Sequence, residues 1–443
     1  MTIHSSDPLF RVFTSNTNLP LVEKAKGNYI YSGGKRFLDL TGGGTSYAIL
    51  GWNNKEVNSA IKSQLVKYTH MDYKIWDDPN TLELAKLVLG TGLASLKKFY
   101  FSGNSGAEAC EAAMKMSRQA HLSKGQTQKK WFISRKQSYH GSTADALALG
   151  DRPNLEIFRD MLSPYRKHVE MHHFKKLALV GESEEAYADR CARELKETII
   201  AIGPENVAGF VGETIMGGLV GDVPPVGNYW KKIKEVCNEY DVHLILDEVY
   251  CGTGTSGKYF CFEYDSIEPD FVFIGKTLAA GYGALSAVIT TDSIYDAIAN
   301  SPEARLQHTT THQAHSLSVS AAIAVQGIVR TSGFVESVNE KGKIFREGFL
   351  KELQNNEHIV DIRGRGLRFS VEHSIPAHRQ IEFGQFFETL MRKKHSILVN
   401  AKWHRICFTP PITLTYSEID ESVSKISYEL NRELPQFANN SMD

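Results

Sequence analysis

The chain has 443 residues, with 50 lysines and arginines against 51 aspartates and glutamates, and its formal net charge is -1. This balance gives no electrostatic case for binding nucleic acid or an anionic membrane surface. The length is enough for a large buried core and favours two domains over one.

The sequence also lacks the marks of a membrane or secreted protein. No stretch approaches the roughly 20 apolar residues that span a bilayer. Residues 1–7 have no basic region followed by an apolar run, so we expect no secretory signal. The six cysteines are scattered without a Cys-x-x-Cys pair, which is typical of reduced thiols. We therefore expect a cytoplasmic protein.

The start of the chain predicts a hairpin followed by two helices. Residues 28–31 and 36–40 are β-like and flank a Ser-Gly-Gly-Lys turn. The three glycines at 42–44 suit a chain that passes close to another group. Apolar residues at helical spacing predict helices over 57–68 and 81–89.

Strands and helices then alternate as far as about residue 290. The β-like apolar runs lie at 98–101, 131–133, 208–211, 244–250, 271–274 and 285–290. The helical patterns lie at 107–119, 185–200 and 229–240. This alternation predicts an α/β fold with a mostly parallel, seven-stranded type of sheet and helices on both faces. Ligands of such sheets bind at the carboxyl ends of the strands.

The pattern changes after residue 317 and predicts a second domain. Its expected elements are helices at 318–330, 333–355 and 417–434, and strands at 359–362, 367–371, 397–399 and 406–408. We therefore expect three parts. Residues 1–65 would be an N-terminal segment that packs with the small domain, 66–319 a large domain, and 320–443 a small α+β domain.

Two charged residues at strand ends mark the stretch from 244 to 276. Asp247 ends one apolar run, and Lys276 follows another after a single glycine. Buried charge is costly unless it is paired, so the two residues suggest a site. The apolar sequence around Lys276 would lower its amine pKa, as imine chemistry requires. Asp247 would bind a protonated ring nitrogen or a metal, or would only cap a turn.

Two further motifs each allow a functional and a purely structural interpretation. Residues 102–108 follow a strand and open a helix, where free backbone N–H groups favour an anion such as phosphate. The alternative is a glycine-rich turn with Ser105 as the N-cap of the helix. Tyr139 either stacks on a flat ring or is a half-buried aromatic at a strand end.

Three conspicuous patterns are weaker evidence for a functional site. Residues 252–257 match G-x-G-x-x-G, but no convincing amphipathic helix follows, so a dinucleotide site lacks its required context. His308, His312 and His315 have no carboxylate or cysteine at ligand spacing, so we expect no metal site. His172 and His173 are most simply a surface pair.

Together the motifs resemble those of class III (ω-amino acid) aminotransferases, pyridoxal-phosphate enzymes of fold type I. The resemblance covers about residues 20 to 430 and rests on the order and spacing of several stretches. These are Ser-Gly-Ala-Glu-Ala at 105–109, Tyr-His-Gly at 139–141, Leu-Asp-Glu-Val at 246–249, Gly-Lys at 275–276, Thr311, Arg-Gly-Arg-Gly-Leu at 363–367, and Pro-Pro at 410–411.

The resemblance implies roles around the cofactor ring. Lys276 would form the internal imine with the cofactor aldehyde and would later move a proton between substrate and cofactor carbons. Asp247 would keep the pyridine nitrogen protonated, which makes the ring an electron sink. Tyr139 and Val249 would contact opposite ring faces, and His140 belongs to the same cofactor-contacting motif as Tyr139.

The resemblance also implies how the phosphate is held. Ser105, Gly106 and Ala107 would bind it through backbone and hydroxyl groups. Glu213 matches a family carboxylate near the cofactor's lysine. Because the family's sites lie at a dimer interface, Thr311 would reach the phosphate of the neighbouring subunit. A homodimer or a tetramer is therefore expected.

Several residues near the expected substrate pocket depart from the family. Tyr250 stands where many members have glutamine, and Cys407 stands where some have an arginine three residues before the paired prolines. Arg405 points the same way as Cys407 on a strand, which makes it a candidate ligand for a substrate carboxylate. Tyr47 and Trp52 would line the entrance or serve as ordinary packing aromatics.

The expected reaction is a pyridoxal-phosphate-dependent, ping-pong transamination. An ω-amino acid, amine or related donor would give its nitrogen to the cofactor, and a 2-oxo acid such as pyruvate or 2-oxoglutarate would accept it. Another activity of the same fold, an aminomutase or a decarboxylase, is the nearest alternative. A nicotinamide dehydrogenase that uses the glycines at 252–257 is the alternative from another class.

Overall fold

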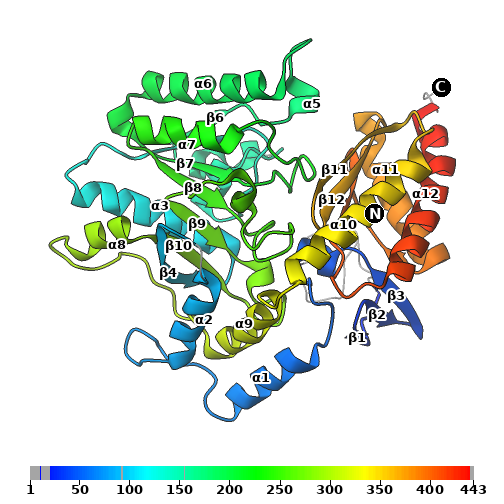
Figure 1. Ribbon diagram of the computed structural model, residues 1–443, viewed down its shortest axis with the longest axis horizontal. Coiled ribbons are helices and arrows are strands. Elements are labelled where there is room, and N and C mark those ends of the chain that lie inside the picture. The colour runs from blue at the N-terminus through cyan, green and yellow to red at the C-terminus, as the bar shows by residue number, and fades with distance from the viewer. Residues whose placement is uncertain (1–9, 11–19, 91–92, 154, 440–443) are drawn as a thin grey trace.

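The computed structural model describes residues 10, 20–90, 93–153 and 155–439, which form two bodies built on separate sheets (Figure 1). Residues 1–7, on which the expected absence of a secretory signal rests, lie outside the described residues. One body holds a seven-stranded sheet, and the other holds two four-stranded sheets.

The central strands of the large sheet are parallel, as their apolar sequences predict. The strand order is β4-β10-β9-β8-β7-β5-β6, and only β10 runs antiparallel to its neighbours. Their bounds are β4 Leu96–Gly103, β5 Trp131–Arg135, β6 Arg166–Val169, β7 Val207–Glu213, β8 His243–Asp247, β9 Phe271–Ile274 and β10 Ser286–Thr291. All residues of β7, β8 and β9 are buried, which is typical of a sheet covered on both faces.

Helices cover both faces because successive strand residues point to opposite sides. The helices of this body are α3 Gly106–Ser123, α4 Ala144–Leu149, α5 Phe174–Leu177, α6 Glu184–Ile202, α7 Tyr229–Glu239 and α8 Asp292–Ala299. Leu244 and Leu246 share a core cluster with residues of α6 and α7. Ile245, between them, packs with residues of α3 and α8 instead. The predicted α/β class is therefore confirmed.

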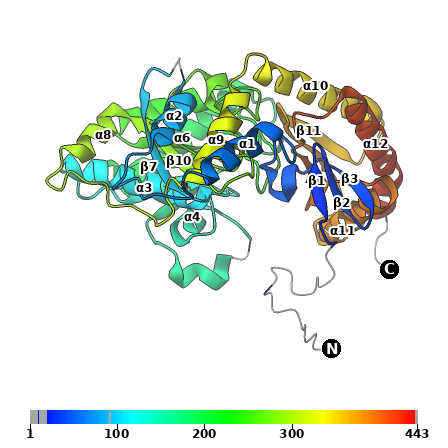
Figure 2. The same ribbon diagram turned by 90° about the horizontal axis from the view of Figure 1, so that it is seen from below.

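The second body joins the two ends of the chain. Its first sheet has the order β1-β2-β3-β13, and its second has the order β11-β12-β15-β14. The bounds are β1 Lys24–Lys26, β2 Tyr29–Ser32, β3 Lys35–Asp39, β11 Ile359–Arg365, β12 Arg368–His373, β13 Ile397–Leu398, β14 Asn400–Lys402 and β15 Arg405–Phe408. Strand β13 pairs with β3 in parallel, so the N-terminal hairpin is completed by the C-terminal part (Figure 2).

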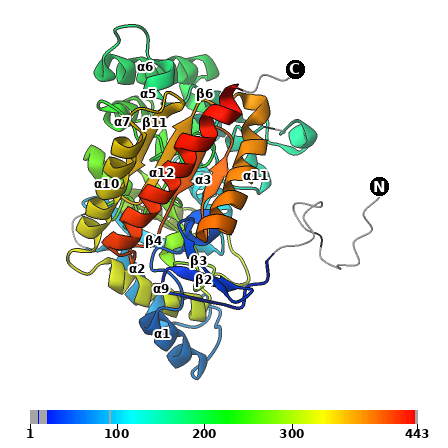
Figure 3. The same ribbon diagram turned by 90° about the vertical axis from the view of Figure 1, so that its right-hand side faces the viewer.

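Three helices pack around this second body. They are α10 Phe334–Leu353, α11 Gln380–Leu390 and α12 Tyr416–Asn439, and α12 runs between the other two in Figure 3. A cluster of phenylalanine rings fills the space under α10. The rings of Phe349 and Phe369 lie 6.3 Å apart, and those of Phe369 and Phe408 stack at 5.0 Å.

Three helices connect the bodies. They are α1 Lys55–Leu65, α2 Pro79–Leu89 and α9 Ser316–Val329, and α9 packs against both others. Asn54 and Asp78 cap α1 and α2 by accepting backbone N–H bonds. Within the described residues, no single helix is long and apolar enough to cross a membrane. Among these residues, only α9 and α10 taken together have the length and composition of a membrane span, and a 72° bend separates them.

Some local expectations are wrong. Strand β8 ends at Asp247 and not at 250, because the Glu248 carboxylate turns to accept N–H bonds from Cys261 and Phe262. His172 and His173 are not a surface pair, since each is only 2% exposed. His172 lies inside because Arg135 donates to its Nδ1 and its Nε2 bonds the Val223 carbonyl oxygen at 3.2 Å. Strands β1, β6 and β14 and helices α4, α5, α8 and α11 are additional elements.

Candidate active site

The candidate site is built at the carboxyl ends of adjacent strands. Glu213 ends β7 and lies in register with Asp247, which ends β8. Asp247 in turn pairs with Phe273 of β9, and Lys276 follows β9 after one glycine. Parallel pairing therefore brings two acids and one lysine to the same edge of the sheet, where such folds bind ligands.

Lys276 has a strained backbone and a weakly basic amine. Its φ is 40°, a left-handed conformation that is uncommon outside glycine and recurs at functional sites. Burial and then the nearby Arg368 charge lower the pKa of Lys276 to about 8, while Asp247 and Glu213 oppose the shift. At pH 7 about a tenth of the amine is then neutral, against less than about a thousandth for an ordinary lysine. The residue stays partly exposed, so a ligand can reach it.

Asp247 is fixed in place by two donors. His140 Nδ1 donates to its Oδ2 at 2.9 Å, and the Val249 N–H donates to its Oδ1 at 3.0 Å. Asp247 is 5% exposed and His140 is 3% exposed. The Nε2 atom of His140 is buried without a hydrogen-bond partner among the described residues. A carboxylate with two oxygens retains acceptor capacity beyond these two bonds, so Asp247 can still bind a protonated group.

Glu213 positions the aromatic residue beside the site. Its Oε1 accepts the Tyr139 N–H at 3.1 Å, and its Oε2 accepts the Gly217 N–H at 3.0 Å. Burial raises the pKa of this carboxyl, which His140 opposes. The Arg152 guanidinium carbon lies 5.0 Å from the centre of the Tyr139 ring. Glu213 therefore acts on the site through the backbone that carries Tyr139.

The N-terminus of α3 is accessible to solvent, and Ser105 caps its backbone. Ser105 accepts the Glu108 N–H at 3.3 Å and donates to a Glu108 carboxylate oxygen at 2.9 Å. The N-cap interpretation of Ser105 is therefore correct. Ser105 is nevertheless exposed, and Gly106 and Ala107 are half-buried, so their N–H groups lie near the surface of a long helix end.

Gly106 is needed for the helix to start beside Val249. A Cβ at Gly106 would lie 2.8 Å from both methyl carbons of Val249. A Cβ at Gly275, just before Lys276, would contact the same Val249 side chain at 3.5 Å. The absence of side chains at the two glycines lets the start of α3 and the end of β9 pack closely against Val249.

Tyr47 and Trp52 lie together near the segment after Lys276. Their rings meet edge to face at 6.2 Å, and the Trp52 indole N–H donates to Asp39 at 3.2 Å. A Cβ at Gly281 would fall 2.5 Å from the Tyr47 ring. The two aromatics thus pack the N-terminal segment against the loop that follows Lys276, which is compatible with either predicted role.

Tyr250 connects the lysine to residues that the sequence interpretation missed. The Lys276 Nζ lies 5.3 Å from the centre of the Tyr250 ring, and the Arg368 guanidinium carbon lies 4.8 Å from it. The Tyr250 hydroxyl donates to Asp222 at 2.7 Å. Neither Arg368 nor Asp222 belongs to a recognisable motif. The available signal was the alternation of polar side chains at 368, 370 and 372 in an otherwise apolar strand.

Arg405 is separated from this group by its own hydrogen bonds. Its two terminal nitrogens donate to the carbonyl oxygens of Leu219 and Gly218, both at 2.7 Å. Arg363 donates likewise to the carbonyls of Val220 and Gly221. The two arginines thus clamp the 218–221 loop to the second body. The Nε of Arg405 is buried without a partner among the described residues, so its predicted role toward a substrate carboxylate stays a prediction.

We expect Arg405→Met to lower the free energy of unfolding by about 2–4 kcal/mol, because the carbonyl oxygens of Gly218 and Leu219 would lose a charged donor. Urea denaturation would measure the change, with the exposed Arg305→Met as a matched control that shifts stability by less than about 0.5 kcal/mol. A stable Arg405→Met variant with a raised KM for acidic donors would instead support the predicted substrate role.

Thr311 and the histidines lie outside this group. Thr311 is exposed on a loop, and its carbonyl oxygen bonds His70 Nε2 at 3.2 Å. The rings of His70 and His315 stack at 4.9 Å. Among the described residues, no three His, Cys, Asp or Glu side chains are placed to hold a metal ion. Contact between Thr311 and a neighbouring subunit stays a prediction.

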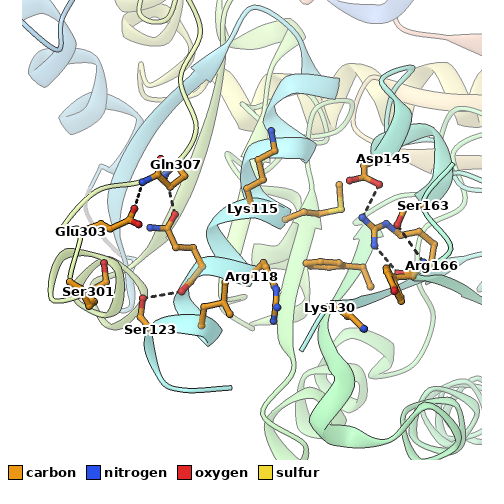
Figure 4. Close-up of a pocket in the computed structure, with 16 residues that line it drawn as sticks. Lys115, Arg118, Ser123, Lys130, Asp145, Ser163, Arg166, Ser301, Glu303 and Gln307 are labelled. Carbon is orange, nitrogen blue, oxygen red and sulfur yellow. Dashed lines mark hydrogen bonds and ion pairs between the residues drawn. The ribbon is translucent and has the colours of Figure 1, made fainter. Parts of the chain in front are cut away.

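Two other candidate regions do not coincide with these residues. A cavity of about 670 Å³ lies beside α3 and is lined by Lys115, Arg118, Lys130 and the ion pair of Arg166 and Asp145 (Figure 4). None of the strand-end residues borders it. The G-x-G-x-x-G run at 252–257 leads through turns into a short 3₁₀ helix, Cys261–Asp265, and not into the helix that a dinucleotide site requires.

Comparisons with known proteins agree with this geometry. The family model for aminotransferase class III matches residues 13–430. An uncharacterized aminotransferase of Schizosaccharomyces pombe is 32% identical over 93% of this chain and 92% of its own. Gamma aminobutyrate transaminase 2 of Solanum lycopersicum is 32% identical over 91% and 90%. The crystal structure of an omega transaminase from Pseudomonas jessenii in complex with PMP superposes with a TM-score of 0.89, at 28% identity over 96% and 95% of the two chains.

Proposed function

The chain belongs to the class III aminotransferases, and we propose that it uses pyridoxal phosphate to move an amino group from an ω-amino acid or another amine to a 2-oxo acid. One observation carries the proposal. A half-buried lysine with an amine pKa of about 8 stands at the same sheet edge as an acid held by two donors.

The residues present fit this cofactor. Gly106 and Gly275 pack closely against Val249, which fixes the side chain proposed to contact the ring. Asp247 retains acceptor capacity for a ring nitrogen, and the exposed N-terminus of α3 suits a phosphate. Tyr139 and Val249 would contact the ring, and Ser105, Gly106 and Ala107 would hold the phosphate. When bound, pyridoxal phosphate supplies an electron-withdrawing ring next to the reacting carbon.

Each residue then has a physical task. Asp247 would hold a proton on the ring nitrogen, because its carboxylate is kept in position by His140 and by the Val249 N–H. Lys276 would move a proton from the substrate carbon to the cofactor carbon, because much of its amine is neutral near pH 8. Glu213 keeps the Tyr139 backbone in place. These tasks support a ping-pong exchange in which donor and acceptor use one site in turn.

We also propose a homodimer that acts in the cytoplasm. The exposed position of Thr311 supports a contact with the phosphate bound by a second copy. The six cysteines are free thiols, which supports a reducing compartment.

A spectrum and a donor assay test the reaction class. The purified protein with pyridoxal phosphate is expected to gain a near-visible absorbance, and an amine donor is expected to yield its carbonyl product continuously only when a 2-oxo acid is also present. Continuous conversion of the amine donor without a 2-oxo acid would indicate a mutase or a decarboxylase. A protein that shows no such absorbance but binds NAD would overturn the proposal.

A further inference from the structure

Arg368 borders the candidate site from the second body. It begins β12 and is among the largest fully buried side chains. One terminal nitrogen donates to the Ser46 carbonyl oxygen at 2.8 Å. Its guanidinium carbon and the Lys276 amine both lie within about 5 Å of the Tyr250 ring centre, at 4.8 and 5.3 Å. The two cations therefore lie beside the same aromatic ring.

The charge of Arg368 has no ion-pair partner among the described residues. No carboxylate lies within 4.0 Å of it, and its Nε is buried without an acceptor. Arg363, on the same sheet, pairs with both Asp361 and Glu372. A buried cation with several unused donors is costly, and the cost is offset when an anion binds.

The nearest buried acid is already engaged. Asp222 accepts from the Tyr250 hydroxyl at 2.7 Å and from the Ser370 hydroxyl at 2.5 Å. Burial raises the pKa of Asp222, although these bonds and the charges of Arg405 and Arg368 oppose the shift. Asp222 thus holds Tyr250 and Ser370, and among the described residues it makes no hydrogen bond or ion pair with the Arg368 guanidinium.

The strand register explains why this position can replace the family arginine. Ser370 pairs with Cys407 across β12 and β15, and Arg368 lies two residues before Ser370. Side chains two apart share a sheet face, so Arg368 projects from the same face as Cys407. The cation missing at 407 is therefore present on the neighbouring strand.

We propose that Arg368 binds the carboxylate of the ω-amino acid donor and so makes the site selective for acids over plain amines. This inference rests on the proposed function, and it adds the residue that sets the substrate class. A guanidinium binds a carboxylate through two parallel hydrogen bonds. The donor's amine would meet Lys276 while its far end meets Arg368, and the Tyr250 ring would lie beside the chain that joins them.

The test compares donors that differ only in the carboxylate. The cofactor-loaded enzyme is mixed with 4-aminobutyrate or with butylamine, and the donor half-reaction is followed as loss of the cofactor absorbance. Arg368→Gln is expected to lower kcat/KM about 10²-fold for 4-aminobutyrate, mainly through KM, and to change it less than about threefold for butylamine. Arg368→Lys is expected to recover part of the preference, and the exposed Lys351→Gln is expected to keep it.

A second measurement uses the apoprotein. The positive charge of Arg368 lowers the pKa of Lys276, as does that of Lys402, while Asp247 and Glu213 raise it. In Arg368→Gln the rate of pyridoxal-phosphate uptake should therefore rise with pH to a plateau that begins above the wild-type value of about 8. An unchanged profile would place Arg368 away from the amine.

A measurement on the wild-type enzyme tests the inference even if the Arg368 variants fail to fold. Butyrate is expected to compete with the donor, and the uncharged butyramide is not. Equal loss of both donors in Arg368→Gln, or equal inhibition by both compounds, would overturn the inference and leave transamination intact. A wild-type enzyme that accepts no amino group from any donor would overturn the proposed function itself.

Discussion

Lys276→Ala is expected to reduce turnover by at least about 10⁴-fold. The variant loses both the nucleophilic amine and the group that moves the proton, and general acid–base catalysis alone accounts for about 10²–10⁴-fold. The measurement is steady-state transfer with saturating donor and 2-oxo acid. The near-visible absorbance of the bound cofactor should change as well, because the covalent link to Lys276 is gone.

Loss of activity in this variant should not come from unfolding. The pKa of Lys276 is lowered to about 8 in the folded chain, so the charged amine costs folding free energy that is fully present below pH 8 and disappears as pH rises through about 10.4. Removal of the amine should leave the melting temperature at pH 7 unchanged or higher. The exposed Lys351→Ala serves as a control with near-normal turnover. A fully active Lys276→Ala enzyme would refute the assigned role.

Asp247→Asn is expected to lower kcat about 10²–10³-fold while part of the cofactor affinity remains. An amide has nearly the shape of the carboxylate but no charge to keep a ring nitrogen protonated. His140 would also lose its charged partner at 2.9 Å. Kinetics and equilibrium titration with pyridoxal phosphate would separate the loss in rate from the loss in affinity.

Asp270→Asn is a matched control for this variant. Asp270 precedes β9 at the opposite end of the sheet, where it bonds the Leu244 N–H and Lys234, both at 2.7 Å. The control should lose some stability and keep its kcat. Near-normal rates in Asp247→Asn would mean that the ring-nitrogen role is wrong.

The sheet and its strand-end residues were predictable because they depend on local sequence. Apolar runs predict buried strands, and parallel pairing alone then brings Asp247 and Lys276 to one edge. The glycines at the start of α3 and before Lys276 were visible for the same reason. The short edge strand β6, Arg-Lys-His-Val, has no apolar run and could not be recognised.

Other features depend on contacts between distant segments. Arg368 meets Ser46 and Tyr250 only after the second body has packed against the first. His172 looked like a surface residue because Arg135, which donates to it, lies on another strand. In sequence, Arg363 and Arg405 look like Arg368. In the structure they differ from it because they bind the carbonyl oxygens of residues 218–221 and lie near acids. No pattern along the chain carries this information.

The pairing of β3 with β13 has a consequence for synthesis on the ribosome. The seven-stranded sheet is complete once residue 291 has emerged, whereas β3, which ends at Asp39, obtains its parallel neighbour only when Ile397 arrives. At about 5–20 residues per second, this leaves an interval of seconds to tens of seconds. In the first part of this interval, before residue 368 is made, the nascent chain holds Lys276 and Asp247 but lacks the strand that carries Arg368. A stalled chain would thus carry the reactive amine without the residue proposed to select its substrate.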